Sequence, residues 1–299
     1  MIQPDPLQSD PDQSASRRRS TTDTPWTPRL WIALVLGVVS QPFVFLYINR
    51  PRLFLIYFLL AIAALAADFY WAVGYFNLLL SVLCPLHAGW LTRRYDARQP
   101  RGWYARWWAA LALYLCLVAG MFGVRSFLFE PFSVPSASML PTLAVGDRIV
   151  VRKWGFGHYG SFGINLLTPG VTDPQRMRRG QVYVFYHPEL QVPYVKRLLG
   201  LPGDTVEVSD KAVLINGQPL PAHLESEDGQ QQLFSETAGE VTYRIRHTGQ
   251  PGAALTGTFV VPQRQYFFVG DNRDDSSDSR HWGAVGSHAI IGELAWVID

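Results

Sequence analysis

The sequence predicts a multi-span α-helical membrane anchor followed by a mainly antiparallel β domain. Of 299 residues, 48% are hydrophobic and only 17% are charged, whereas soluble proteins carry about 25% charged residues. Residues 30–129 are dominated by Leu, Ala, Val, Phe and Trp, and residues 130–299 hold short strand-like runs separated by turn signals. The net charge of +2 without a basic stripe gives no reason to expect nucleic acid as a partner.

The first 129 residues divide into a polar tail and an apolar region. Residues 1–28 are rich in Asp, Gln, Ser, Thr and Pro, cannot bury a core, and are predicted to be disordered. Because one span needs about 20 apolar residues, residues 29–129 are expected to hold about four spans. These are Leu30 to Ile48 with a kink at Pro42, two helices within 53–90 that turn near Asp68 to Asn77, and Trp107 to Phe129.

The charges next to the last span predict its orientation. Five arginines precede Trp107 with only Asp96 opposing them, and Arg-rich short loops stay in the cytoplasm. The chain after Phe129 should therefore lie outside the cytoplasm. For the N-terminus the signals conflict, because three upstream spans place it outside and Arg17–Arg19 favour inside. Cys84 and Cys116 both lie in apolar segments and are expected to be free thiols.

The region 130–299 contains many short runs of β-formers. Turn signals separate them, which is typical of an antiparallel barrel or sandwich, and Asn216-Gly217 predicts a two-residue hairpin. Residues 154–163 combine glycines with aromatic side chains and are expected to form a loop or irregular hairpin that dips into the membrane interface. Residues 221–252 are polar and are predicted to be a variable excursion from the domain.

The candidate nucleophile is Ser138, in a stretch bounded by Pro135 and Pro141 that is expected to be extended and stiff. A serine nucleophile needs a base. None of the seven histidines lies in a catalytic or zinc-binding motif. Lys196 is the other candidate base, provided that burial keeps it neutral by lowering its pKa by about 3–5 units. Strand periodicity alone favours a solvent-facing Lys196. The residue pattern therefore does not decide which side chain acts as the base.

A third polar cluster, residues 270–280, follows a very apolar strand and is rich in carboxylates, hydroxyls and arginines. Such loops are most often plain turns. Calcium is the alternative, but the spacing and the closing Glu of an EF-hand are missing.

Three blocks of sequence together resemble the bacterial type I signal peptidases (leader peptidases), a family of Ser/Lys serine peptidases. They are Pro-Ser-Ala-Ser-Met-Leu-Pro-Thr-Leu with Gly146-Asp147, then Tyr-Val-Lys-Arg-Leu-Leu-Gly-Leu-Pro-Gly-Asp, then Gly-Asp-Asn-Arg-Asp-Asp-Ser-Ser-Asp-Ser-Arg. The blocks occur in the family's order after a membrane helix. The resemblance covers residues 125–299 and leaves the first hundred residues unexplained.

The resemblance implies roles for individual residues and makes 130–299 an extracytoplasmic β catalytic domain. Ser138 corresponds to the nucleophile and Lys196 to the general base. Ser136 and the backbone N–H of Ser138 correspond to the oxyanion hole, and no metal or cofactor is expected. Supporting roles fall to Ser276, which orients the lysine, and to the ion pair of Asp278 and Arg280. The expected substrate-binding residues are Phe132, Val134, Met139, Leu143, Tyr194 and Val195.

The implied function is that of a membrane-bound endopeptidase that cuts signal peptides from exported preproteins after small, Ala-x-Ala-like residues. Its expected place is the bacterial cytoplasmic (inner) membrane, as a multi-pass protein. Its expected partners are preprotein signal peptides, the lipid bilayer and the protein export machinery. The alternatives are a dedicated maturation peptidase for pilus or conjugation proteins, a self-cleaving protein with a scissile bond near residues 237–239 or 252–254, and a non-catalytic membrane assembly factor.

Overall fold

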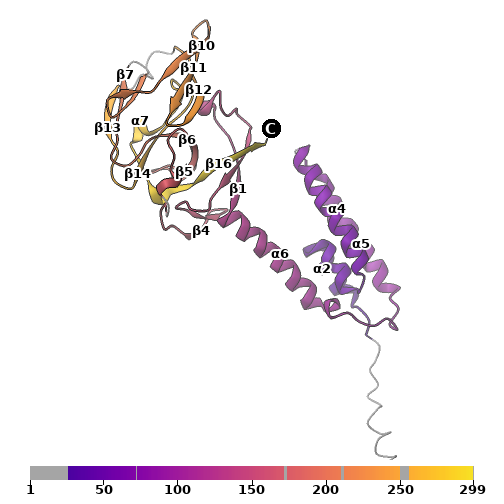
Figure 1. Ribbon diagram of the computed structural model, residues 1–299. Helices are drawn as coiled ribbons and strands as arrows, with labels where there is room; N and C mark the ends of the chain where they lie inside the picture. Colours follow the sequence, from indigo (N-terminus) through magenta and orange to yellow (C-terminus); the bar gives the residue numbers. More distant parts are fainter. Residues whose placement is uncertain (1–25, 72, 172–173, 210–211, 250–255, 299) are drawn as a thin grey trace, which may run out of the picture. The chain divides into compact units, whose positions relative to one another are not determined.

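The computed structural model describes residues 26–71, 73–171, 174–209, 212–249 and 256–298 (Figure 1). Most of the predicted disordered tail, and the candidate self-cleavage segment at 252–254, lie outside the described residues. The chain divides into two compact units, Met1–Val118 and Ala119–Asp299.

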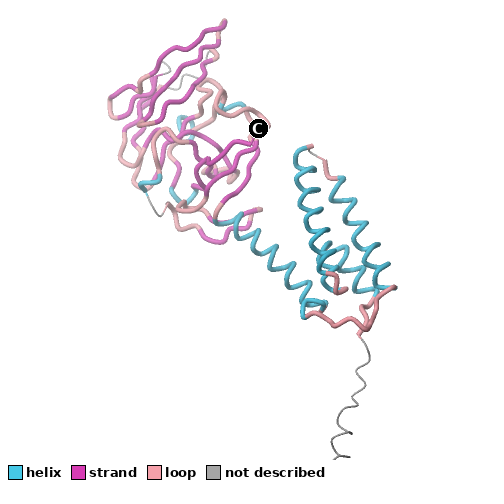
Figure 2. The backbone as a smooth tube through the Cα atoms, turned by 45° about the vertical axis from the view of Figure 1, so that its right-hand side comes forward, coloured by secondary structure: helices cyan, strands magenta, loops and turns pink. Residues whose placement is uncertain are grey.

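The first unit is built from helices (Figure 2). They are α2 (Leu30–Val39), α3 (Val44–Tyr47), α4 (Pro51–Tyr70), α5 (Tyr75–Arg93) and the first part of α6 (Trp107–Phe127). The predicted turn between α4 and α5 is confirmed. The Asp68 carboxylate accepts the backbone N–H groups of Phe76 and Asn77 at 3.1 and 3.0 Å, which satisfies free donors in the first turn of α5.

The segment predicted as the first span is not one helix. Gln41 adopts a positive φ of 41° and Pro42 follows it, so α2 stops and a short 3-10 turn (Gln41–Phe43) leads into α3. The ten residues of α2 extend about 15 Å, half of the roughly 30 Å hydrocarbon core. Residues 43–48 are instead buried inside the helical unit.

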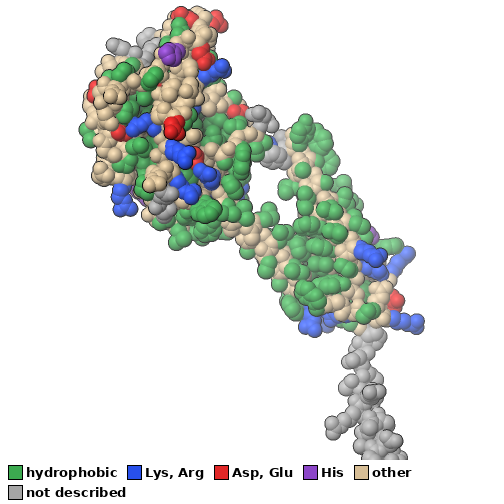
Figure 3. Space-filling view, in the orientation of Figure 1, with side chains coloured by type: hydrophobic (Ala, Val, Ile, Leu, Met, Phe, Trp, Pro, Cys, Tyr) green, Lys and Arg blue, Asp and Glu red, His purple; other side chains and the backbone are tan. Residues whose placement is uncertain are grey.

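Three helices in the described part of the chain are long and apolar enough to cross a membrane: Pro51–Asp68, Tyr75–Arg93 and Trp107–Phe127. Their outer faces carry exposed hydrophobic side chains, which cover much of this unit in Figure 3. The two cysteines are free, as expected.

The second unit is an antiparallel β domain, as predicted (Figure 1). Its main sheet has seven strands in the order β1-β2-β16-β5-β6-β14-β15. Their bounds are β1 (Phe129–Ser133), β2 (Arg148–Arg152), β16 (Ile290–Ile298), β5 (Val182–Tyr186), β6 (Pro193–Gly200), β14 (Gln265–Val269) and β15 (Val285–Gly286). Strand β1 begins directly after α6, so the nucleophile segment that follows β1 is close in sequence to the last helix.

Smaller sheets complete the domain. One has the order β13-β7-β8-β9, with β13 (Gly257–Val260), β7 (Thr205–Ser209), β8 (Ala212–Ile215) and β9 (Gln218–Pro219). The predicted Asn216-Gly217 hairpin is confirmed, with positive φ at both residues, as a type I′ turn requires. The predicted irregular hairpin is also present, as β3 (Tyr159–Ser161) and β4 (Ile164–Leu167), and it exposes Phe162 and Ile164.

The region predicted as a variable excursion, residues 221–252, contains regular structure that the sequence analysis did not predict. This region forms a three-stranded antiparallel sheet of β10 (Ala222–Asp228), β11 (Gln231–Ala238) and β12 (Val241–His247). Its sequence looks irregular because β10 is exposed along its whole length, and buried and more exposed side chains alternate only in β12 and at the end of β11. Ala238 and Ile245 pack in the same core cluster as Phe267.

A buried ion pair between Glu236 and Arg273 connects this sheet to the loop after β14. Glu236 of β11 accepts hydrogen bonds from the guanidinium of Arg273 and, at 2.5 Å, from the Tyr243 hydroxyl. Glu236 and Arg273 are each 2% exposed. Removing one partner of such a pair leaves an uncompensated buried charge.

We therefore expect Glu236→Gln to lower the free energy of unfolding by about 3–5 kcal/mol. Urea denaturation of the full chain in detergent, followed by near-UV circular dichroism, measures the change. The matched control is Glu225→Gln, which breaks the exposed 2.9 Å pair with Arg244 and should cost less than about 1 kcal/mol. Equal effects of the two changes would contradict the structural role of the three-stranded sheet.

Candidate active site

Ser138 lies in a 3-10 turn, Ala137–Met139, that follows β1. The segment expected to be extended is interrupted by this turn, and its backbone is extended at Ser136 before the turn and at Leu140 after it. The turn is held from the loop after β14, because the Asn272 side chain donates to the Ala137 carbonyl at 3.0 Å and its backbone N–H donates to the Ser138 carbonyl at 3.1 Å. Ser138 is 7% exposed, and two hydrogen bonds from Asn272 hold the turn that carries it.

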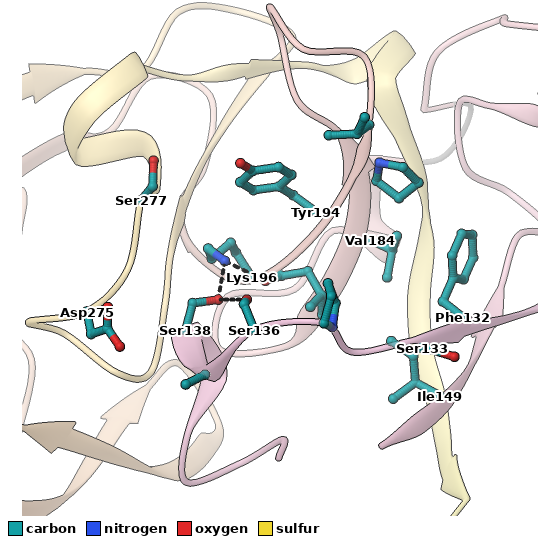
Figure 4. A pocket seen from close by; sticks show the side chains of 15 residues that line it. Phe132, Ser133, Ser136, Ser138, Ile149, Val184, Tyr194, Lys196, Asp275 and Ser277 are labelled. Carbon is teal, nitrogen blue, oxygen red and sulfur yellow. Dashed lines mark hydrogen bonds between the residues drawn. The ribbon is translucent and has the colours of Figure 1, made fainter. Parts of the chain in front are cut away.

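Lys196 reaches Ser138 from strand β6 (Figure 4). Its Nζ lies 2.6 Å from the Ser138 Oγ and 3.1 Å from the Val195 carbonyl oxygen. The side chain is 3% exposed, so the solvent-facing orientation favoured by periodicity is wrong. From Lys196 to Gly200 every residue of β6 is buried, so both faces of this part of the strand are covered and Lys196 lies in the interior of the domain.

Burial sets the protonation of Lys196. Loss of hydration lowers the pKa of its ammonium from 10.5 to about 8, against the opposing charges of Asp278 and Asp271, while Arg280 lowers it further. At a pKa of about 8, roughly one amine in ten is neutral at pH 7. A neutral amine can accept a proton from the nearby Ser138 hydroxyl.

Ser136 lies on the open side of the nucleophile. Its Oγ is 3.2 Å from the Ser138 Oγ, and the residue is exposed. The two hydroxyls therefore face the same space (Figure 4). An oxygen atom that enters this space can receive a hydrogen bond from Ser136.

The three residues with predicted supporting roles meet in the loop after β14. Asp278 is fully buried, pairs with the Arg280 guanidinium at 2.8 Å and caps helix α7 (Ser279–Trp282). The Ser276 hydroxyl donates to Asp278 at 2.7 Å, so its recorded bond is to this carboxylate and not to Lys196. Burial raises the pKa of Asp278, but the hydrogen bond and charge of Arg280 outweigh it and hold that pKa below its usual value.

Gly270 allows this loop to approach the nucleophile. A Cβ atom at this position would lie 2.1 Å from the Ser276 Oγ and 2.6 Å from the Ser138 carbonyl oxygen. Both distances are shorter than any van der Waals contact. Only glycine therefore lets the supporting loop pack directly against the turn that carries Ser138.

A second buried ion pair lies beside the site, and it was not predicted from the sequence. The Arg197 guanidinium donates to the Asp271 carboxylate at 2.7 and 2.5 Å, and the Thr142 hydroxyl donates to the same carboxylate at 2.5 Å. Asp271 is completely buried. This pair links the segment after Ser138, strand β6 and the loop after β14. In the sequence, the feature that indicates this pair is an acidic residue, Asp271, that follows the very apolar strand β14.

A cavity of 550 Å³ opens beside Ser138 and Lys196 (Figure 4). Three of the expected substrate-binding residues, Phe132, Tyr194 and Val195, line it. The lining also includes residues that were not predicted: Ser133, Pro135, Ala137, Ile149, Val184, Val192, Pro193, Asp275 and Ser277. Most of these surfaces are apolar, and they come from the chain before Ser138, the chain before Lys196 and strands β2 and β5.

The other three expected substrate-binding residues do not line this cavity. Val134, Met139 and Leu143 are at most 2% exposed and belong to the hydrophobic core with Ile149 and Val151. In a 3-10 turn, successive side chains point about 120° apart. Met139 is therefore directed into the core when Ser138 faces the cavity.

Comparison with known proteins identifies a family and relatives that this chain resembles. A family model described as "Signal peptidase, peptidase S26" matches residues 105–298. The chain is 41% identical over 187 residues to a signal peptidase I from Pseudomonas fluorescens, covering 57% of this chain and 64% of that protein. It is 33% identical over 194 residues to a signal peptidase I from Rickettsia typhi, covering 58% of this chain and 73% of that protein.

Among solved structures, a signal peptidase I from Enterococcus faecalis V583 shares 28% identity, covers 40% of this chain and 96% of its own, and gives a TM-score of 0.27. The chain matches slightly less than two thirds of the length of the Pseudomonas relatives, 64% in each case.

The electrostatics of Lys196 give a prediction with a defined sign. We expect its amine to titrate near pH 8, because burial disfavours the ammonium form. Asp278→Asn should lower this pKa further, since it removes a negative charge that stabilises the ammonium. NMR titration of the full chain in detergent, with carbon-13 label at the lysine ε-carbons, measures both values.

The control is Asp275→Asn, which changes an exposed carboxylate at the cavity wall and should leave the midpoint nearly unchanged. An amine that titrates near its ordinary value of 10.5, or a rise in the pKa in Asp278→Asn, would show that burial does not control Lys196.

Proposed function

The chain belongs to the signal peptidase family, peptidase S26, and from this membership we propose that it is a membrane-bound serine endopeptidase. Its substrates are exported preproteins, from which it removes N-terminal signal peptides. The observation that carries the proposal is the 2.6 Å contact between the buried Lys196 amine and the Ser138 hydroxyl at the edge of a cavity.

The reaction begins with the neutral form of Lys196. The amine takes the proton of the Ser138 hydroxyl as its oxygen attacks the scissile carbonyl carbon. The resulting oxyanion receives hydrogen bonds from the Ser136 hydroxyl and the Ser138 backbone N–H. The Lys196 ammonium then protonates the leaving amine, and a water molecule, deprotonated by Lys196, hydrolyses the acyl-enzyme. Because only the neutral amine starts the cycle, the rate rises with pH up to about pH 8 and then levels off.

The supporting loop positions the base. Asp278 is paired with Arg280 and accepts the Ser276 hydroxyl, and Gly270 allows the loop to pack against the Ser138 turn. Ser276 thus acts on Lys196 through Asp278, whose charge contributes to the pKa of the lysine.

Cleavage after small residues is the specificity that this cavity favours. Phe132, Tyr194 and Val195, with Ile149 and Val184, place large apolar side chains around the space next to Ser138. Such a lining suits short apolar side chains of an extended Ala-x-Ala-like peptide. The substrate's backbone would run between the chain segments before Ser138 and before Lys196.

The three long apolar helices serve as a multi-pass anchor in the bacterial cytoplasmic membrane. We assign residues 29–129 to this anchor and 130–299 to the catalytic domain. The arginines between α5 and α6 support a cytoplasmic position for that loop, and the catalytic domain then lies on the extracytoplasmic side. In this setting the partners are the lipid bilayer and the protein export machinery.

Removing the nucleophile or the base tests the chemistry. Ser138→Ala and Lys196→Met should each abolish cleavage of a purified preprotein in detergent, with an unchanged circular dichroism spectrum, because methionine fills the lysine site without a charge. Ser209→Ala changes an exposed serine at the end of β7 and should cleave normally. Cleavage by either active-site variant at the normal rate would refute the assignment, and an inactive wild-type chain would support a non-catalytic binding role.

The role of Ser136 predicts a purely kinetic defect. Ser136→Ala removes one donor to the oxyanion and should lower kcat by about 10²–10³-fold. KM should change little, because the bond forms only in the transition state. Steady-state cleavage of a signal-peptide substrate separates the two constants. A defect confined to KM would place Ser136 in substrate binding and not in the oxyanion hole.

A further inference from the structure

The helical unit contains a second cavity, of 660 Å³, that has no part in the proposed reaction. It is formed by the segment before α2, the residue Tyr47 of α3 and the chain that enters α6. Its lining consists of cationic and aromatic side chains with few others: Trp26, Thr27, Arg29, Ile32, Tyr47, Arg101, Arg106, Trp107 and Trp108.

We infer that this cavity binds the phosphate group of an anionic phospholipid. The inference rests on the proposed membrane location of the helices and adds a ligand to it. Three arginines from two separate segments converge there, and no carboxylate lines the cavity. Within the described ranges, none of the three forms an ion pair with an acidic residue.

Hydrogen bonds and ring stacking preorganise part of the cavity for binding an anion. Arg101 donates to the Ala105 carbonyl at 3.1 and 2.9 Å and stacks over the Trp26 ring at 3.8 Å, so its guanidinium is fixed in place. The Tyr47 hydroxyl accepts the Arg29 backbone N–H at 2.8 Å and keeps its own proton for a ligand. Guanidinium groups that lack a protein anion bind phosphate by charge-assisted hydrogen bonds.

The positions of the cavity's arginines and tryptophans at the ends of apolar helices favour the phosphate of a lipid over a phosphate in solution. Arg29 directly precedes the apolar helix α2, and Arg106 directly precedes α6. Trp26, Trp107 and Trp108 lie at the same boundary, where aromatic residues prefer the headgroup level of a bilayer. Figure 3 shows Lys and Arg side chains gathered at one end of the helical unit and hydrophobic side chains along its length.

The surroundings also favour a lipid over a soluble phosphate. The proposed orientation places this boundary in the cytoplasmic leaflet, which carries anionic lipids, and basic pockets between membrane helices on that side bind such headgroups. Helix α2 leads away from the cavity with exposed apolar side chains, including Trp31 and Val35. Acyl chains can lie on this surface, whereas a free phosphate would gain nothing from it.

The test measures lipid binding to the full-length chain in detergent by native mass spectrometry. The probes are phosphatidylglycerol, phosphatidylcholine and the soluble glycerol 3-phosphate. The variant Arg29→Gln/Arg106→Gln avoids Arg101, whose stacking on Trp26 has a structural role. With about fivefold lost for each arginine, it should bind phosphatidylglycerol about 25-fold more weakly than wild type.

The matched control, Arg93→Gln/Arg98→Gln, removes the same charge from exposed arginines outside the cavity and should bind like wild type. Arg29→Lys/Arg106→Lys keeps the charge and should retain most of the affinity, which guards against a folding artefact.

Three results would overturn the inference. They are equal losses in the cavity and control variants, equal affinity of wild type for the two lipids, and glycerol 3-phosphate binding as tightly as phosphatidylglycerol. Preprotein cleavage is assayed separately on the same samples. A chain that prefers phosphatidylglycerol but does not cleave would refute the proposed function alone, and a chain that cleaves without any lipid preference would refute only the inference.

Discussion

The burial of one amine, that of Lys196, is the constraint on which the β domain depends. A lysine that forms a salt bridge stays protonated, and an ammonium cannot act as a base. Two carboxylates, those of Asp278 and Asp271, are close enough to influence its pKa. Each is already paired with an arginine, Asp278 with Arg280 and Asp271 with Arg197. Burial therefore outweighs their attraction, and the pKa of Lys196 falls to about 8.

The polar three-stranded sheet takes part in the same arrangement. The end of β12 pairs with the loop after β14, where the Arg246 N–H donates to the Asp271 carbonyl at 2.8 Å and the Arg273 N–H donates to the Arg246 carbonyl at 2.9 Å. The Tyr243 ring stacks on the Arg197 guanidinium at 3.8 Å. This sheet therefore supports the loop that carries Asp271 and Asp278, and its Tyr243 packs on the arginine that pairs with Asp271, although the sheet contributes no residue to the cavity beside Ser138.

The two units differ in whether their cationic side chains have acidic partners. In the β domain, the buried cations Lys153, Arg197, Arg273 and Arg280 each have a carboxylate partner, and Lys196 is left to lose its proton. In the helical unit, the arginines at the second cavity have no acidic partner among the described residues. Paired cations stabilise a fold, whereas an unpaired amine in the interior or unpaired guanidinium groups at a boundary are free to react or to bind.

The sequence by itself determined what depends on local pattern. Helices α4, α5 and α6 follow from runs of apolar residues, and the Asn216-Gly217 hairpin follows from the conformations that these two residues tolerate. Ser138 and Lys196 were assigned their roles through the resemblance of three short sequence blocks to a known family, because the residue pattern alone left the base open. These features need only neighbours in the chain, so a single sequence carries them.

Only the tertiary structure decided which side chains are buried and which charges meet. Periodicity favoured a solvent-facing Lys196, but both faces of β6 are covered from Lys196 to Gly200, and the turn that carries Ser138 packs against the amine. Arg197 and Asp271 are 74 positions apart, and nothing in the sequence pairs them. The strands within residues 222–247 were not recognised from the sequence, because the exposed edge strand β10 shows no alternation of apolar and polar residues. The segment predicted as the first span is not one helix, because α2 ends before Gln41 and Pro42. The burial of Lys196 and the pairing of Arg197 with Asp271 depend on contacts between distant segments, which local propensity does not encode.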